Sequence, residues 1–553
     1  LSREQSQTLL QALLPGAEFS ETTLVEIFDK SAGNPFYLKE VTRSLIENGA
    51  VVQATAADEA APRWQVTSRI EQITVPDSLH AAIVARIDRL TEDARQGLQM
   101  AAVLGREFRA DLLRAITQAR EEADLWLAQL ERGGLLRPAE TTQLPGYTFP
   151  DALVQEVAYD SILVQNRMQL HRRVGEALEE LGADNSTQFH QLLAYHFGRS
   201  DDSVRAIKYL RLAAQEARDE YANETAIVDY QQLLEWQRRV QDVAGQAQAR
   251  YAMGVLAYEI GDYDRAMPWL EEATMLFQQL GDENNVGWSI MYEGMVALKR
   301  GLYGEAAEYH RRALGLAQQR GDSFQEGIHL TNLARVTLRL GDYPLALEQF
   351  RASLALKQQN NDVTGQAFAW FYLGLTHVFR GEGDVAEAAF QKSLELWRQT
   401  PKNERGLSYC HYGMGLLALQ RERFVEAADY FRRAHEISVK LVLKAETIED
   451  LSFLGRAEAG LGRREAALEA SRQALSLLRT QRDVEAVQAI YLNAYRVLSA
   501  FGEAEAEAAL AQAYAIVREQ AQHLEDETAR RRFLEELPVN REILSAARSV
   551  GLA

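Results

Sequence analysis

A repeat with a period of about 40 residues runs through the C-terminal part of the chain and limits its fold more than any other feature. Small residues recur seven positions before each turn of the repeat, as at Gly374, and five positions after it, as at Ala386. Such positions let two helices approach closely, so each unit predicts a helix, a short turn and a second helix. One hairpin cannot bury its own apolar face, and the units must therefore stack. The turns fall at Tyr221, Gly261, Gly301, Gly341, Gly381, Glu422, Gly462 and Gly502.

The residues at these turns predict how the helices end and begin. Glycine accepts the left-handed conformation that ends the first helix, and the aspartate that follows it, as at Asp262, can cap the second. The glycine, the tyrosine of the turn and the small positions resemble the tetratricopeptide repeat over residues 205–525, in about eight units, although the usual period is about 34 residues. Residues 526–553 combine charged residues with an apolar face that includes Phe533 and Ile543, so we expect C-terminal capping helices.

Upstream of residue 205 the period stops, and four further segments are predicted. Residues 1–50 form a small helical domain, 51–74 a linker, 75–150 a winged-helix domain and 151–204 a helical connector. The winged helix is predicted because helices are followed by two short strands, at 135–137 and 147–149, around a Pro-Gly turn. We therefore expect an all-α chain: a tetratricopeptide-repeat superhelix preceded by the small helical domain and the winged helix.

Charge and hydropathy argue against nucleic acid and membrane as partners. The chain has 79 acidic and 60 basic residues, a net charge of −19, whereas binding to a phosphate backbone needs clustered Lys and Arg. The helix before the predicted wing carries four acids, Glu121, Glu122, Asp124 and Glu131. No apolar run approaches the roughly 18 residues that span a bilayer, and no signal-peptide pattern opens the sequence. A single cysteine excludes a disulfide framework and fits the cytoplasmic location that we expect.

The sequence carries none of the common catalytic motifs. A phosphate loop (Gly-x-x-x-x-Gly-Lys-Ser/Thr), His-Glu-x-x-His, Cys-x-x-Cys and Gly-x-Ser-x-Gly are all absent. The lone Cys410 is interpreted as a small packed residue. We therefore expect no enzyme activity, no metal and no cofactor in this chain.

The order of the modules resembles the C-terminal part of the bacterial STAND proteins, signal transduction ATPases with numerous domains that are often fused to adenylate cyclases or transcription regulators. The resemblance rests on Gly-Asn-Pro-Phe-Tyr-Leu at 33–38, Val-Pro-Asp-Ser-Leu at 75–79, the predicted wing, Gln-Glu-Val-Ala-Tyr at 155–159, and the long repeats. It implies that residues 1–50 are a lid domain and that a nucleotide-binding domain holding ADP or ATP with magnesium precedes them. Because no start methionine is present, we expect the chain to be a fragment of such a protein.

The resemblance also implies roles for particular residues. Gly33, Asn34 and Pro35 would contact the adenine of the nucleotide in the parent protein, with Pro35 supplying the apolar contact. Asp151 stands where a histidine often reaches the phosphates, although a carboxylate would repel them. The winged helix would pack over the nucleotide in the resting state. Binding of an inducer to the repeats would free the ATPase, which would then oligomerise.

The first helices of tetratricopeptide hairpins line a concave groove, and their spacing predicts which residues face it. Aromatic and basic residues gather at these positions, which suits a peptide or protein with acidic and apolar side chains. The alternative is that the aromatic rings pack between helices and the basic groups are solvated. The predicted groove residues are Trp288, Phe368, Phe371, Tyr409 and Tyr412, with Lys299, Arg335, Arg339, Arg456 and Arg496 on or near the same face.

Three functions follow as hypotheses. The leading one is the sensor and autoinhibitory region of a STAND ATPase, which binds a protein, peptide or small-molecule inducer and releases an upstream nucleotide switch. The first alternative is a tetratricopeptide scaffold that assembles proteins without a switch. The second is the regulatory part of a transcription activator or an adenylate cyclase.

Overall fold

The computed structural model divides into two compact units, residues 1–216 and 217–553, which are described separately. Part of the predicted 51–74 linker, and the first three residues of the Val-Pro-Asp-Ser-Leu motif at 75–79, lie outside the residues that the structure describes. Those described residues are 1–54, 63–72, 78–117, 120–139, 146–181, 187–400, 403–481 and 484–552. No helix among them is both long and apolar enough to cross a membrane.

The segment 1–50 is helical, as the sequence predicts. Side-chain caps begin each of its three helices, and at the start of α3 the side-chain carbonyl oxygen of Asn34 accepts the backbone N–H of Phe36 at 2.9 Å. Two short strands follow and pair antiparallel, with Val51 opposite Val66. The elements are α1 (Arg3–Leu13), α2 (Glu21–Ser31), α3 (Pro35–Glu47), β1 (Val51–Gln53), β2 (Trp64–Val66) and the 3₁₀ helix η1 (Ser68–Gln72).

A second group of helices carries a small three-stranded sheet. The two strands expected from the sequence are present as β4 (Arg137–Pro138) and β5 (Gly146–Thr148), and they pair antiparallel. A third strand, β3 (Glu107–Arg109), joins the other edge of β5. The sequence did not reveal β3 because its three residues between two helices are too short to show an alternating pattern.

The helices around this sheet complete the first unit. Their apolar faces are buried, and Leu98, Leu113 and Leu130 have no exposed surface. The helices are α4 (Leu79–Ile87), α5 (Glu92–Leu104), α6 (Ala110–Ile116), α7 (Arg120–Arg132), α8 (Ala152–Asp160), α9 (Val164–Glu180), α10 (Thr187–Phe197) and α11 (Ser203–Asp219), in which the boundary between the units falls.

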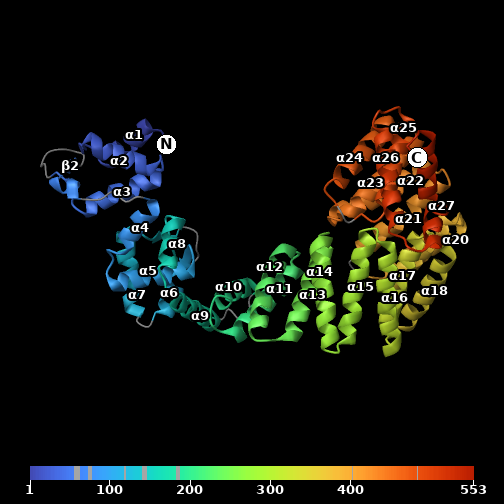
Figure 1. Cartoon of the computed structure of the whole chain (residues 1–553), viewed down its shortest axis with the longest axis horizontal. Helices are drawn as coiled ribbons and strands as arrows, with labels where there is room; N and C mark the ends of the chain where they lie inside the picture. Colours follow the sequence, from blue (N-terminus) through green and yellow to red (C-terminus); the bar gives the residue numbers. More distant parts are fainter. Residues whose placement is uncertain are drawn as a thin grey trace. The chain divides into compact units, whose positions relative to one another are not determined.

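The second unit consists of consecutive helical hairpins, and Figure 1 shows α13 to α18 standing side by side. Most of its helices share one length, which explains why the repeat is so regular in the sequence. The helices are α12 (Asn223–Arg239), α13 (Val243–Glu259), α14 (Tyr263–Gln279), α15 (Glu283–Lys299), α16 (Tyr303–Arg320), α17 (Ser323–Arg339), α18 (Tyr343–Gln359), α19 (Val363–Phe379), α20 (Gly383–Arg398), α21 (Glu404–Gln420), α22 (Phe424–Lys440), α23 (Lys444–Gly460), α24 (Arg464–Leu478), α25 (Val487–Ala500) and α26 (Ala506–Gln522).

The predicted turns are confirmed. All eight turn residues have a left-handed backbone, with φ between +56° and +82°, including the non-glycine residues Tyr221 and Glu422. Aspartates cap the following helices as expected: Asp262 accepts the N–H of Arg265, and Asp342 that of Leu345.

Several of the turns are preceded by a glycine because a bulky side chain from the second helix lies against that position. A Cβ atom added at Gly294 or Gly374 would lie 2.7 Å from the ring of His310 or Phe390. Atoms in van der Waals contact are normally about 3.5–4.0 Å apart, so these positions admit only glycine unless the hairpin opens. The predicted all-α superhelix of tetratricopeptide hairpins is therefore confirmed in its packing.

The two last helices, α27 (Glu527–Glu535) and α28 (Pro538–Ser549), do more than cap the end of the array. Phe533 is fully buried, and its ring centroid lies 5.7 Å from that of Tyr303 at the start of α16. Arg532 pairs with Asp342, which caps α18, at 2.5 Å. The C-terminal helices thus pack against hairpins from much earlier in the chain, and α27 lies beside them in Figure 1.

Candidate functional site

Three of the predicted groove residues meet at one carboxylate. Oε1 of Glu485 lies 2.6 Å from Nη2 of Arg335 and 3.2 Å from Nζ of Lys299, and Oε2 lies 3.2 Å from Nη2 of Arg339. The cations belong to the first helices α15 and α17, whereas Glu485 belongs to the connection between α24 and α25. All four side chains are only 13–26% exposed. We call Lys299, Arg335, Arg339 and Glu485 the cation cluster.

The electrostatics of the cation cluster favour a bound anion. Burial by itself would raise the pKa of Glu485, but Lys299, Arg335 and Arg339 hold it well below its usual range. Arg335 also donates to Asn332 at 3.3 Å, and its guanidinium lies 5.5 Å from the ring centroid of Tyr372. Its Nε is buried and has no hydrogen-bond partner among the described residues. The cluster therefore keeps a donor that Glu485 does not use.

A second carboxyl group near the cluster titrates close to neutral pH. Burial, together with the negative charges of Glu485 and Glu446, raises the pKa of Glu449, on the first helix α23, to about 7, against the attraction of Arg339. Glu449 stands six positions before the small Gly455, the same spacing that separates the predicted groove residues Trp288 and Tyr409 from Gly294 and Gly415. The sequence pattern could therefore have identified it if acidic residues had been included.

The predicted aromatic residues form two groups that pack between helices. The rings of Phe368, Phe371 and Tyr409 are neighbours, with Tyr409 5.7 and 5.5 Å from the other two. Phe371 is only 4% exposed, and Phe368 meets the buried Trp397 edge-on at 4.9 Å. These contacts favour the packing interpretation for the two phenylalanines.

The tyrosines and the tryptophan keep part of their surface exposed. Tyr412 packs edge-on against Phe453, with 5.6 Å between the ring centroids. The hydroxyl of Tyr409 donates to Glu446 at 3.1 Å, and Glu446 also pairs with Arg405 at 2.5 Å. Trp288 is not part of either group, and its ring instead lies 6.4 Å from that of His329.

Arg456 and Arg496 do not join the cation cluster. Arg496 pairs with Glu542 of α28, whose Oε1 lies 2.5 Å from its Nε. Burial, together with the neighbouring positive charge of Arg496, lowers the pKa of Arg456 to about 10. The four arginines at 335, 339, 456 and 496 are all partly buried, so they are only partly solvated.

The residues assigned to the nucleotide by resemblance lie at or next to the starts of helices. Gly33 has a left-handed backbone, with φ +77°. Asn34 caps α3, and Pro35 is its first residue. The carboxylate of Asp151 accepts the N–H of Leu153 at 2.9 Å and so begins α8.

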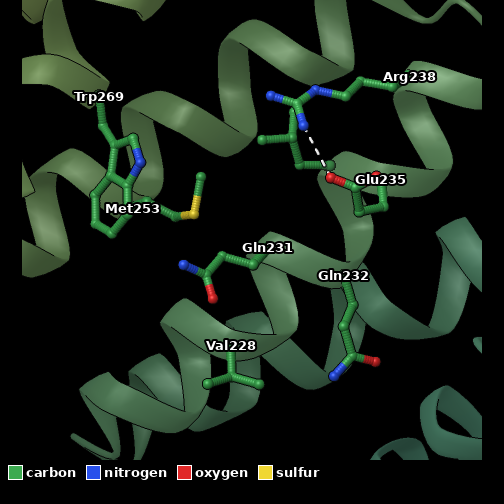
Figure 2. Close-up of a pocket in the computed structure, with 8 residues that line it drawn as sticks. Val228, Gln231, Gln232, Glu235, Arg238, Met253 and Trp269 are labelled. Atoms are coloured by element: carbon green, nitrogen blue, oxygen red, sulfur yellow. Dashed lines mark hydrogen bonds and ion pairs between the residues drawn. The ribbon is translucent and has the colours of Figure 1, made fainter.

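An open pocket of about 390 Å³ lies between α12, α13 and α14, away from the predicted groove residues. Figure 2 shows Gln231 and Met253 directed into it and Arg238 paired with Glu235 at 2.8 Å on one side. The lining mixes amides, an internal ion pair and apolar atoms, with no group that converges on a reacting atom. The described residues include no group of three or more His, Cys, Asp or Glu that could hold a metal.

The repeats match known protein-family models. Residues 289–359 and 366–440 match one model of the tetratricopeptide repeat, and residues 247–280 match another. The repeat is thereby identified within the range that the sequence predicts. None of the curated proteins compared with the chain matches it.

Several solved structures are similar in fold. A STAND protein with a tetratricopeptide repeat sensor from Pyrococcus horikoshii has 12% identity and a TM-score of 0.44, covering 100% of this chain and 74% of its own. A Rap protein complexed with Competence and Sporulation Factor has 14% identity, coverage of 72% and 98%, and a TM-score of 0.43. The quorum sensor NprR from B. thuringiensis has 15% identity, coverage of 66% and 97%, and a TM-score of 0.42.

Proposed function

We propose that the repeat unit is the sensor of a signalling protein and binds an inducer with acidic and apolar groups, a peptide or a segment of a protein. The observation that carries this proposal is the convergence of Lys299, Arg335 and Arg339 from successive hairpins on one partly buried place. Removing charged groups from water is costly unless an anion compensates them. Within the cluster, Glu485 is the one carboxylate that the three cations share.

The chemistry of the cluster suits the proposed ligand. Guanidinium groups bind carboxylates through a planar pair of donors, which gives orientation as well as attraction. Tyr372, Tyr409 and Tyr412 keep part of their surface exposed, and the ring of Tyr372 lies 5.5 Å from the guanidinium of Arg335. A peptide that combines a carboxylate with an apolar side chain would satisfy both kinds of group.

We also propose that inducer binding acts on a nucleotide switch outside this chain, which the first unit holds inactive. This part rests on the order of modules and on the Gly33-Asn34-Pro35 turn. The described residues do not suit phosphates, because Asn34 and Asp151 are used as helix caps and Asp151 is itself negative. ADP or ATP with magnesium would therefore be held by the parent's nucleotide-binding domain, and this chain by itself should not hydrolyse ATP.

A selection of peptides tests the sensor. The whole chain is immobilised and panned with a random hexapeptide library displayed on phage, with a variant carrying Arg335→Ala and Arg339→Ala as the matched counter-target. We expect the chain to enrich peptides with Asp or Glu next to Leu, Phe or Tyr, and the variant to lose them. Enrichment that the double variant retains would refute the groove assignment, and basic peptides would refute the proposed chemistry.

The scaffold alternative makes a different prediction. A scaffold without a switch would bind its partners without any effect on a nucleotide-binding domain. In the full-length parent, the selected peptide should therefore accelerate release of a fluorescent ADP analogue (mant-ADP). An unchanged release rate, with the peptide bound, would favour the scaffold.

A further inference from the structure

Glu485 reaches the cation cluster from a distant part of the chain. It lies 150 residues after Arg335 and 146 after Arg339, in the turn just before α25 begins at Val487. It is not at any of the repeated groove positions, because it precedes the first helix of its own hairpin. The three cations were predicted from the spacing of groove positions. The carboxylate that pairs with them comes from a residue that this spacing does not include.

The contacts of Glu485 are those that a ligand's carboxylate would make. One oxygen is shared by Arg335 and Lys299, and the other faces Arg339. Because Nε of Arg335 has no partner among the described residues, Glu485 leaves the site incompletely used. A ligand whose carboxylate approached the guanidinium side-on would bind Nε as well as Nη2, and so gain one hydrogen bond over Glu485.

The position of Glu485 also allows exchange. Its side chain and those of its three partners keep 13–26% of their surface exposed, so water and a ligand can reach the ions. Since Glu485 precedes α25, moving it does not require a helix to unwind. Turns at helix ends are among the parts of a protein that open at the lowest free energy.

We propose that Lys299, Arg335 and Arg339 form the carboxylate-binding site of the inducer groove, and that Glu485 occupies this site in the unliganded protein until a carboxylate of the bound peptide replaces it. This inference rests on the proposed function. Glu485 would then compete with the peptide for the three cations, so that only peptides with a correctly placed carboxylate displace it.

The expected change in peptide affinity depends on the fraction of molecules in which Glu485 fills the site. A ligand that binds only when the site is empty loses apparent affinity by the fraction of molecules in which it is empty. If Glu485 fills the site nine-tenths of the time, its removal should raise the affinity about tenfold. The Glu485→Gln variant keeps the shape of the side chain and removes its charge.

Three peptides serve as probes, each labelled with an uncharged boron-dipyrromethene dye and measured by fluorescence anisotropy on the whole chain. The first is Gly-Phe-Leu-Gly-Leu-Glu with an amidated C-terminus, the second has Gln in place of Glu, and the third is the Gln peptide with a free C-terminal carboxylate. We expect Glu485→Gln to bind the first peptide about tenfold more tightly than the wild type does, with no gain for the second. The third peptide shows whether a C-terminal carboxylate is accepted too.

A matched control removes a different carboxylate. Glu542→Gln takes away the partner of Arg496, which lies on the same predicted face but outside the cluster. It should leave the affinity for all three peptides unchanged. If Glu542→Gln raised the affinity as much as Glu485→Gln, the effect would be one of net charge, and the assignment of the site would be overturned.

The outcomes separate this inference from the proposed function. Equal affinity of wild type and Glu485→Gln for the Glu peptide would overturn the internal occupant, while peptides from the phage selection would still support the sensor. Binding only by Glu485→Gln would support the inference. Binding by neither would overturn the carboxylate site, and the phage selection would then decide the sensor by itself.

A second variant and a second readout guard against loss of folding. Glu485→Asp keeps the charge but shortens the side chain, so it should give a smaller rise in affinity. In the wild type, the Glu peptide should increase hydrogen exchange in the connection between α24 and α25, since Glu485 has left its partners. Unchanged or slower exchange there, with the peptide bound, would contradict displacement.

Discussion

Replacing Glu449 with glutamine should make the protein more stable at alkaline pH and leave it unchanged at acidic pH. Glu449 is a carboxyl group whose folded-state pKa is about 7, against an ordinary value of 4.5. The neutral form is therefore favoured in the folded state. Its stabilising contribution is complete below about pH 4.5 and is lost as the pH rises through 7. Glutamine stays neutral throughout, so it avoids this loss.

The magnitude follows from the two pKa values. One pH unit corresponds to about 1.36 kcal/mol, so the difference between 4.5 and about 7 amounts to about 3 kcal/mol of unfolding free energy above pH 8. The difference between variant and wild type should grow from near zero at pH 4.5 to about this value. The charged groups that set the shift are Arg339, Glu485, Glu446 and Lys299, and none of them is altered.

Urea denaturation of both proteins at pH 4.5, 6, 7 and 8.5 measures this difference, followed by circular dichroism. Glu446→Gln is the matched control, one turn earlier on the same helix. Although burial opposes it, the pairing with Arg405 lowers the pKa of Glu446, so its contribution is present above pH 4.5 and lost in acid. Glu446→Gln should therefore destabilise at neutral pH. A constant difference between Glu449→Gln and wild type across this range would refute the reasoning.

Three further substitutions test the packing of the second unit, each by urea denaturation. Gly374→Ala should destabilise it by about 1–3 kcal/mol, because the new Cβ would lie 2.7 Å from the ring of Phe390. Glu422→Gly should stabilise it by about 1 kcal/mol, because φ is +56° there and glycine tolerates a left-handed backbone. Phe533→Ala should cost about 3–5 kcal/mol and expose α27 and α28 to protease, because the ring is fully buried against Tyr303.

Each of these has a control within the same unit. Gly315→Ala, in a helix with open space around the new Cβ, should stabilise by up to about 1 kcal/mol. Gly462→Ala reverses the change at Glu422 and should destabilise, because φ is +70°. Phe324→Ala removes a ring that is 48% exposed and should have little effect. Similar losses in Phe324→Ala and Phe533→Ala would contradict the docking of the C-terminal helices.

Sequence by itself determined the repeating unit and much of the site. The period of the repeat placed all eight left-handed turns, since a helix end and its cap are decided by the few residues around them. The small positions were identified correctly, because the close approach of the two helices in a hairpin favours a small residue at the same place in successive repeats, as at Gly294 and Gly374. The spacing within the first helices also placed Lys299, Arg335 and Arg339 on one face, since helical periodicity sets the direction of side chains.

Tertiary structure alone decided what those side chains meet. The contact of Glu485 with Arg335 and that of Arg532 with Asp342 join residues 150 and 190 apart in the sequence. Such contacts depend on the small rotation between neighbouring hairpins, which accumulates over many repeats and leaves no local pattern. Phe371 illustrates the same limit: its spacing places it towards the groove, but the neighbouring rings of Phe390 and Tyr409 bury it. Periodicity therefore specifies which face a residue takes, and the superhelix specifies what lies opposite.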